Sequence, residues 1–300
     1  MPSPILTPTP AYAASQPRLS RRRFAGATAA TAAALAMGGL SLPGLAPAVA
    51  RAQSMDPYTY IRPMPATTDL GQRPGQEAAA IAPVQADNAT WTTYLQLPIK
   101  EGQDFHYTCE FDSAWIILKA YGLEVPLQQQ IAFVGIDDSL EPWYEERADG
   151  VVVWGGDVNE YYCGDYETNF LARARGNAMK KVFEGSGLTA TVVNDRPGIE
   201  RALAAGQPVF FKSTVDFLDW VPATWITPAN AEYPVVLGND HALIVMGHND
   251  EDVIIRDPLG PTSTNGTRPY QYRVTWDRYL EVFAAQGNDG IAVGTAKTAG

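Results

Sequence analysis

The amino-acid sequence predicts an α+β fold, in which a helical half is followed by a half built from an antiparallel β-sheet. Apolar residues recur at helical spacing soon after residue 105, and short β-rich runs separated by turn residues fill the second half. The two kinds of segment do not alternate one for one, which argues against a parallel sheet built from βαβ units. With 300 residues, 46% of them hydrophobic, the chain can bury a substantial core.

The first 52 residues read as an export signal. Residues 20–24 are "SRRRF", and a weakly apolar run rich in Ala, Gly and Thr follows and ends in small residues. Paired arginines before such a run are typical of a twin-arginine signal, with cleavage expected after Ala50 or Ala52. A membrane anchor is the alternative, but small residues and two prolines make this stretch a poor bilayer span.

Charge excludes some partners. Five of the 22 basic residues and none of the 33 acidic ones lie in the signal, so the remainder carries a formal charge of −16. Such a surface repels nucleic-acid phosphates and anionic membranes, and we expect neither as a partner. We expect a monomer in the cell envelope, in the periplasm or secreted, with the twin-arginine translocase as its partner during export.

Residues 53–93 are rich in Pro, Ala, Gln and Thr and show no sustained period, which is typical of a linker or an N-terminal arm. The folded domain is predicted to span 94–300. It opens with an alternating stretch at 94–100, "YLQLPIK", of the kind that forms a half-buried strand.

The first strong helix is predicted to start after Thr108, a suitable N-cap residue, and to stop at Gly122. Its apolar side chains follow helical spacing at Phe111, Trp115, Leu118 and Tyr121. Cys109 therefore falls in the first turn of a helix with a buried face.

The remaining elements follow in order. Residues 137–166 are rich in Asp, Gly and aromatic residues and are predicted to be a loop. A helix is expected over 169–184, and a second from Pro197 to Gly206, where a proline opens and a glycine closes the pattern. Next come β-rich runs at 208–215, 241–247 and 252–258, a helix at 275–286 and a last strand at 290–294.

Two of these runs allow a geometric inference. Asn249 and Asp250 are good turn residues between "HALIVMG" and "DVIIRDP". A hairpin folded about residue 249 puts His241 opposite Asp257, where side chains start roughly 5 Å apart. Because both runs are apolar on both faces, the hairpin is expected to be buried.

Together with the helix, this pair suggests acyl-transfer chemistry. A thiol in the first turn of a helix feels the positive end of the helix dipole, which favours the thiolate. Cys109 would be the nucleophile, His241 its base and Asp257 the group that orients the imidazole. The backbone N–H of Cys109 and the side-chain amide of Gln103 would stabilise the oxyanion.

The order of these residues resembles that of the papain-like cysteine peptidases. Within them it is most similar to the peptidase C-thirty-nine-like group, which is related to bacteriocin-processing, double-glycine-leader peptidases. The resemblance rests on the six-residue spacing from Gln103 to Cys109 and on "DHALIVMGHNDEDVIIRDPLG" at 240–260, and it covers roughly residues 94–294. It implies a papain-like fold and the roles of nucleophile, general base, orienting carboxylate and oxyanion donor for Cys109, His241, Asp257 and Gln103.

The sequence departs from that pattern after the nucleophile. Many members of the group have Gly-Pro there, whereas this chain has "CEFDSAW". Glu110 and Asp112 put two negative charges beside the thiol, which opposes its ionisation.

Other roles for these residues stay open. An exported protein can keep a Cys109–Cys163 disulfide, and Cys109, His241 and Asp257 are chemically able to bind zinc, although no compact metal-ligand motif occurs. His106 is close enough in sequence to approach the thiol, and His248 is expected to be exposed. Three aspartates of the predicted loop could bind a cation, or the loop is simply solvated: Asp137, Asp138 and Asp157.

The sequence therefore predicts an exported cysteine hydrolase that cuts peptide or amide bonds, with a peptide or cell-wall peptide as substrate and no cofactor or metal. Two alternatives remain. One is an acyltransferase that uses the same acyl-enzyme, as transglutaminase-like relatives do. The other is a catalytically inactive module that binds peptides or cell-wall fragments.

Overall fold

The computed structural model describes residues 59–60, 91–260 and 269–295. The expected export signal and nearly all of the expected arm lie outside the described residues. The described helices are α3 (Cys109–Ala120), α4 (Leu127–Val134), α5 (Gly176–Gly185), α6 (Arg196–Ala204), α7 (Trp276–Ala285) and the short 3₁₀ helix η1 (Val215–Phe217). The described strands are β1 (Thr59–Tyr60), β2 (Thr93–Tyr94), β3 (Ile136–Asp137), β4 (Trp143–Arg147), β5 (Gly150–Trp154), β6 (Tyr162–Cys163), β7 (Leu188–Val193), β8 (Val209–Thr214), β9 (Pro222–Ile226), β10 (Glu232–Val236), β11 (Asp240–His248), β12 (Asp252–Arg256), β13 (Gln271–Thr275) and β14 (Gly290–Thr295).

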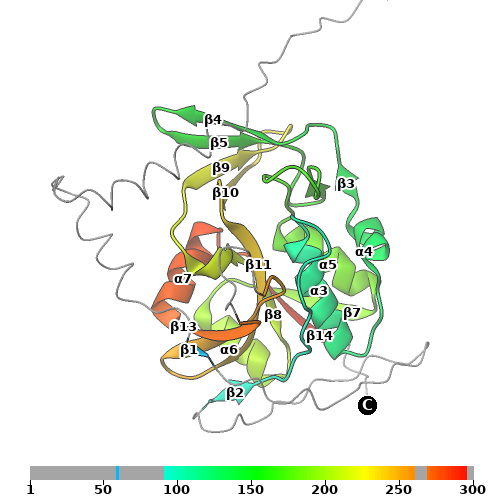
Figure 1. Cartoon of the computed structure of the whole chain (residues 1–300), viewed down its shortest axis with the longest axis vertical. Coiled ribbons are helices and arrows are strands. Elements are labelled where there is room, and N and C mark those ends of the chain that lie inside the picture. The colour runs from blue at the N-terminus through cyan, green and yellow to red at the C-terminus, as the bar shows by residue number, and fades with distance from the viewer. Residues whose placement is uncertain (1–58, 61–90, 261–268, 296–300) are drawn as a thin grey trace, which may run out of the picture. The chain divides into compact units, whose positions relative to one another are not determined.

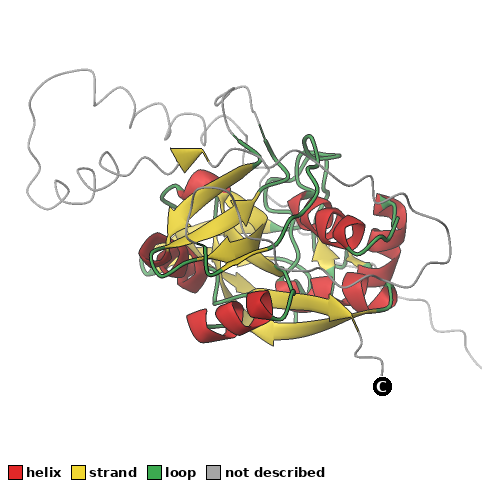
Figure 2. Ribbon diagram, turned by 90° about the horizontal axis from the view of Figure 1, so that it is seen from below, coloured by secondary structure: helices red, strands yellow, loops and turns green. Residues whose placement is uncertain are grey.

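An antiparallel sheet organises the described residues. Its strands follow the order β1-β13-β12-β11-β8-β14-β7, and β2 also pairs with β11 (Figure 1). Helices lie on both sides of it, as Figure 2 shows. The fold is therefore of the mixed α+β kind that the sequence predicts.

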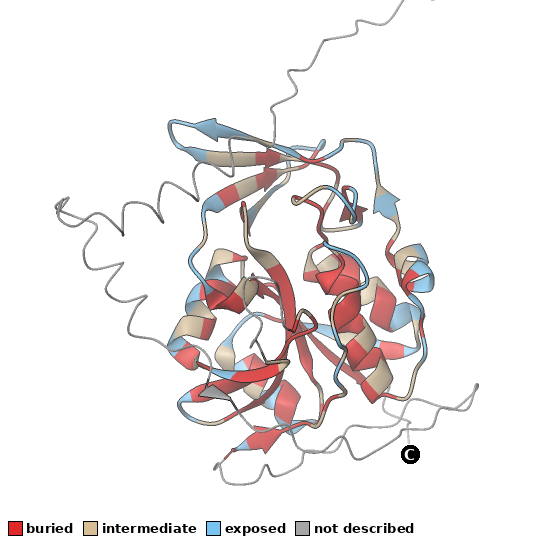
Figure 3. Cartoon of the chain, in the orientation of Figure 1, coloured by how far each residue is buried: buried red, intermediate tan, exposed pale blue. Residues whose placement is uncertain are grey.

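Alternate residues of the central strands explain why both faces of the sheet are buried. In β8 and β11, Phe210 and Ile244 pack with α3, α4 and α5, whereas Phe211 and Val245 pack with α6 and α7. A strand covered on both faces reads as a continuous apolar run, which is what the sequence has here. Figure 3 shows β11 and the inner face of α3 as buried.

Several helices begin and end close to where the sequence predicts them. α6 starts one residue before Pro197, and Asp195 caps it by accepting a hydrogen bond from the backbone N–H of Gly198 at 2.7 Å. α7 is capped in the same way by Thr275. α3 starts after Thr108 as expected, but the Thr108 hydroxyl bonds other groups and does not cap the helix.

The prediction that 137–166 is a loop is wrong. β4 and β5 form an antiparallel hairpin there, and β5 pairs in parallel with β9 in a second sheet of order β10-β9-β5-β4. Trp225 of β9 is fully buried against Gly155, where any side chain would collide with the indole. The partner strand lies some seventy residues away in sequence, so the local composition could not indicate it.

Other boundaries also differ. α5 begins at Gly176 instead of residue 169, because Arg173 pairs as an isolated bridge with Cys163 before the helix starts. The alternating stretch at 94–100 contributes only β2, which ends at Tyr94. Helix α4 and the strands β7, β9, β10 and β13 are elements that the sequence pattern did not indicate.

The register of β11 and β12 is also not the predicted one. The turn runs over 249–252, and a β-bulge in β11 adds a residue, so that Ile244 lies opposite Arg256. The predicted pairing puts Ile244 opposite Ile254, two positions nearer the turn. Asp257 follows directly after β12 and contacts His241 even so, because its side chain reaches across from the strand end.

Candidate active site

The segment before α3 carries Gln103 and is held against the helix by Asp112. The Asp112 carboxylate is buried and accepts hydrogen bonds from the Thr108 hydroxyl at 2.7 Å and from the backbone N–H of Asp104 at 3.3 Å. Lys100 lies 3.2 Å from the same carboxylate. The Gln103 Nε2 atom is buried and has no hydrogen-bond partner among the described residues. A buried N–H donor without an acceptor lowers the stability of the fold, so the side-chain amide of Gln103 is unusual at this position.

His241 and Asp257 are in contact. His241 Nε2 lies 2.9 Å from Asp257 Oδ1, and both side chains are buried. Asp257 also accepts hydrogen bonds from the Tyr272 hydroxyl and from the backbone N–H of Leu259, each at 2.8 Å. Because Asp257 engages Nε2, the other ring nitrogen, Nδ1, is the one available for chemistry.

Helix α3 is docked on the strand that carries His241. The Ser113 hydroxyl donates to the backbone carbonyl of Ala242 at 2.9 Å. Cys109 precedes Ser113 by four residues, so the two lie on the same face of the helix. The beginning of α3 is thus held near the beginning of β11.

Within the described residues, no hydrogen bond joins Cys109 to His241. The Cys109 thiol instead donates to Glu110 Oε2, with a sulfur–oxygen distance of 3.2 Å. Cys109 is 6% exposed and does not form a disulfide.

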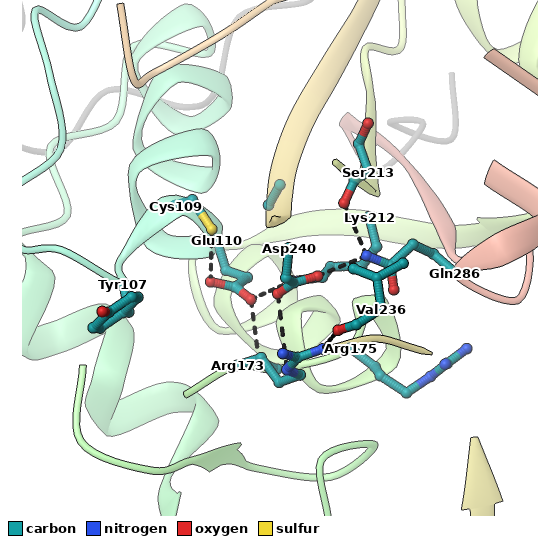
Figure 4. Close-up of polar contacts among 12 residues, drawn as sticks. Tyr107, Cys109, Glu110, Arg173, Arg175, Lys212, Ser213, Val236, Asp240 and Gln286 are labelled. Carbon is teal, nitrogen blue, oxygen red and sulfur yellow. Dashed lines mark hydrogen bonds and ion pairs between the residues drawn. The ribbon is translucent and has the colours of Figure 1, made fainter. Parts of the chain in front are cut away.

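Charged side chains that are at most 8% exposed surround this carboxylate, and we call Glu110, Arg173, Lys212 and Asp240 the buried charge cluster (Figure 4). The Lys212 ammonium donates to Glu110 Oε1 and, at 2.9 Å, to Asp240 Oδ2. Arg173 Nε lies 3.9 Å from Asp240 Oδ2, and Gln286 donates to Asp240 Oδ1 at 2.6 Å. The strands β8 and β11 supply Lys212 and Asp240, so the cluster is formed by residues far apart in sequence.

These surroundings shift ionisation in clear directions. Burial raises the pKa of the Cys109 thiol well above its usual range; the negative charge of Glu110 adds to this, and Lys212 opposes it. Burial alone would lower the pKa of Lys212, but the carboxylates of Asp240 and Glu110 outweigh it and raise that pKa. Burial alone would raise the pKa of Asp240, but Arg173 and Lys212 lower it. The sequence indicates two opposing influences on this thiol, the helix dipole and the charge of Glu110; in the folded protein burial and Glu110 raise its pKa.

The disulfide alternative is not formed. Cys109 and Cys163 are both free thiols, and they belong to different hydrophobic clusters. Burial also raises the pKa of Cys163.

The other histidines differ in their surroundings. His106 is exposed and packs beside Tyr107. The expectation that His248 is exposed is wrong: it is 6% exposed, because β2 pairs beside it and the Trp276 ring covers it. Among the described residues, no group of three or more His, Cys, Asp or Glu side chains is arranged to hold a metal ion. Nor is any helix in the described part of the chain long and apolar enough to span a bilayer.

Sequence reasoning missed part of this site. Lys212 stands alone in the apolar run "PVFFKSTV", and a lysine in a strand buried on both faces requires a charged partner, which is a signal that was available. Tyr272 and Arg173 carried no such signal, because their partners come from distant elements.

Among known proteins, this chain matches a solved structure but no sequence family. No family model and no curated protein sequence matches this chain. A solved structure described as that of a "putative C39-like peptidase" from Bacillus anthracis does match, with a TM-score of 0.52 and 17% sequence identity. The match covers 66% of this chain and 94% of that one. At this identity the likeness establishes a shared α+β fold and leaves the chemistry to be argued from the site.

Proposed function

We propose that this protein is a cysteine hydrolase that cleaves peptide or amide bonds on a papain-like fold. The observation that carries the proposal is the 2.9 Å contact between buried His241 and Asp257. His241 lies on β11, the strand on which the first turns of α3 are docked. Fold likeness to a protein described as a peptidase adds support.

The chemistry follows from the positions of these groups. Cys109 Sγ attacks the substrate carbonyl while its proton passes to His241 Nδ1, since Asp257 engages Nε2. N–H groups in the first turn of a helix have no acceptor within the helix, so that of Cys109 is suited to the developing oxyanion. The unpartnered Nε2 of Gln103 is the second proposed donor. His241 then protonates the leaving amine, and water hydrolyses the acyl-enzyme.

Cleavage of a mixed peptide library tests this proposal, because such a library offers many different peptide bonds at once. The wild-type protein is expected to produce new peptide termini, detected by mass spectrometry, and Cys109→Ser and His241→Ala to produce none. Equal cleavage by wild type and Cys109→Ser, or no cleavage by any of them between about pH 6 and pH 9, would contradict it.

One observation favours a second candidate, an inactive peptide- or cell-wall-binding module. The Cys109 thiol is almost fully buried and is hydrogen-bonded to a carboxylate, which disfavours a reactive thiolate. In that case library peptides are retained by the immobilised protein but stay uncut. An acyltransferase is recognised in the same assay by adding an amine and finding it attached to the new C-termini.

Export by the twin-arginine translocase remains part of the proposal. Its test is the location of the protein in cells when Arg21 and Arg22 are both changed to Lys. Retention of the variant inside the cell supports export by this route, and unchanged export argues against it.

A further inference from the structure

The two oxygens of Glu110 have different partners. Oε1 accepts hydrogen bonds from Lys212 and, at 3.3 Å, from the backbone N–H of Ala174. Oε2 accepts the thiol hydrogen of Cys109 at 3.2 Å. The first two contacts come from separate elements and hold the fully buried carboxylate in place, so that its other oxygen points at the sulfur (Figure 4).

The charges of the cluster balance without the thiol. Glu110 and Asp240 carry two negative charges, and Lys212 and Arg173 carry two positive ones, and none of these side chains is more than 8% exposed. A thiolate at Cys109 would add a negative charge with no counter-charge in the cluster, which is unfavourable in a buried site. The titratable groups that act on the thiol from the elements packed around it are Glu110 on α3, Lys212 on β8, Asp240 on β11 and Tyr162 on β6. His241 follows Asp240 on β11, and Arg173, in the segment before α5, faces Asp240.

We propose that Glu110 is a positioning residue that holds Cys109 as a neutral thiol in the resting protein. The catalytic consequence of this inference rests on the proposed hydrolase function. In that hydrolase, Cys109 and His241 do not form a thiolate–imidazolium ion pair before the substrate is attacked. The S–H bond breaks as the S–C bond forms, the proton goes to His241 Nδ1, and the carbonyl π electrons move to the oxygen. When the tetrahedral intermediate collapses, those electrons return, the C–N bond breaks and the amine leaves with the proton from His241.

The test is the pH dependence of alkylation. Iodoacetamide labelling of Cys109 is followed by mass spectrometry between about pH 6 and pH 10, with buried Cys163 as internal control. In Glu110→Gln, the amide oxygen can still accept from Lys212 and Ala174, while the negative charge beside the sulfur is gone. We expect the midpoint of labelling to fall by about one pH unit or more. At a fixed pH below both midpoints, the labelling rate rises only roughly threefold for each pH unit by which the midpoint falls, because a less basic thiolate is also a weaker nucleophile.

Asp240→Asn is the matched control. It removes one negative charge from the same cluster without removing the group hydrogen-bonded to the thiol, and Asp240 is the weaker electrostatic influence on Cys109. Its midpoint is expected to fall by less than that of Glu110→Gln. Equal shifts in the two variants would mean that the net charge of the cluster, and not the contact with Glu110, sets the labelling midpoint, which would overturn the proposed role. An unchanged midpoint in Glu110→Gln would overturn it as well.

A measurement on the unmodified protein covers the case in which Glu110→Gln fails to fold. The infrared S–H stretching band that is lost in Cys109→Ser should be present at neutral pH and displaced, relative to that of Cys163, by hydrogen bonding to a carboxylate. Its absence at neutral pH would show a resting thiolate and overturn the inference. Failure of peptide-library cleavage with the band present would instead refute the hydrolase and leave the contact between Glu110 and the thiol standing.

Discussion

Asp257 is held from three directions at the scale of single residues. His241, Tyr272 and the backbone N–H of Leu259 all lie within 2.9 Å of its oxygens, and its side chain is fully buried. A buried carboxylate needs such partners, because water no longer solvates it. Tyr272 is therefore as much a part of this arrangement as His241.

Tyr272→Phe removes one of those donors and leaves the aromatic ring in place. The free energy of unfolding is expected to fall by about 1.5–3 kcal/mol, the usual contribution of a hydrogen bond to a charged group. Urea denaturation measures it. The exposed Tyr161, whose ring packs under Lys181, provides the control Tyr161→Phe, for which almost no change is expected. Similar small losses in both variants would argue against the role of the Tyr272 hydroxyl.

At the scale of elements, the contact between α3 and the segment that carries Gln103 depends on pH. Burial raises the pKa of Asp112 to about 6, against the opposing effects of the Thr108 hydroxyl and Lys100. The folded protein therefore holds a proton on Asp112 more tightly than the unfolded chain, whose aspartates titrate near 3.8. This contribution to stability is present below about pH 4 and is lost as the pH rises to about 6.

Asp112→Asn removes the titration. The free energy of unfolding of wild type minus that of the variant should decrease between about pH 4 and pH 6, by up to about 3 kcal/mol for a shift of this size. Chemical denaturation at several pH values measures the difference, and the comparison cancels groups common to both proteins. A difference that stays constant, or grows as the pH rises, contradicts the shift.

At the scale of the whole described fold, Arg173 connects the two larger sheets. Its guanidinium donates to the backbone carbonyl of Val236 in β10 at 2.8 Å, lies against the Trp225 ring of β9 and faces Asp240 of β11. Arg173 is 1% exposed. Its loss would leave the buried charge cluster with an excess negative charge.

Arg173→Met is expected to lower the free energy of unfolding by about 3–5 kcal/mol, since an unpaired buried charge remains. Arg147 offers a matched control, because it also pairs with a carboxylate and lies against a tryptophan, but on the surface. Arg147→Met should cost less than about 1 kcal/mol. Thermal or urea unfolding compares the two variants, and similar losses in both would refute the argument from burial.

Local sequence patterns predict an element where its own residues determine its structure. The spacing of Phe111, Trp115, Leu118 and Tyr121 predicts α3, and the proline-to-glycine interval predicts α6. Such signals fail when the partner is remote. β5 is a strand because β9 pairs with it, and α5 starts late because the chain first pairs with Cys163.

What could be read from the sequence alone is therefore the α+β class and the nearness of His241 to Asp257, since sixteen residues and one turn separate these two side chains. The surroundings of Cys109 could not be read in this way. Lys212 and Asp240 are brought together by the pairing of β8 with β11, and the packing of distant segments brings Glu110 and Arg173 to them. A charge in a buried site is stabilised by whatever the fold brings within a few ångströms of it, and spacing along the chain does not report that distance.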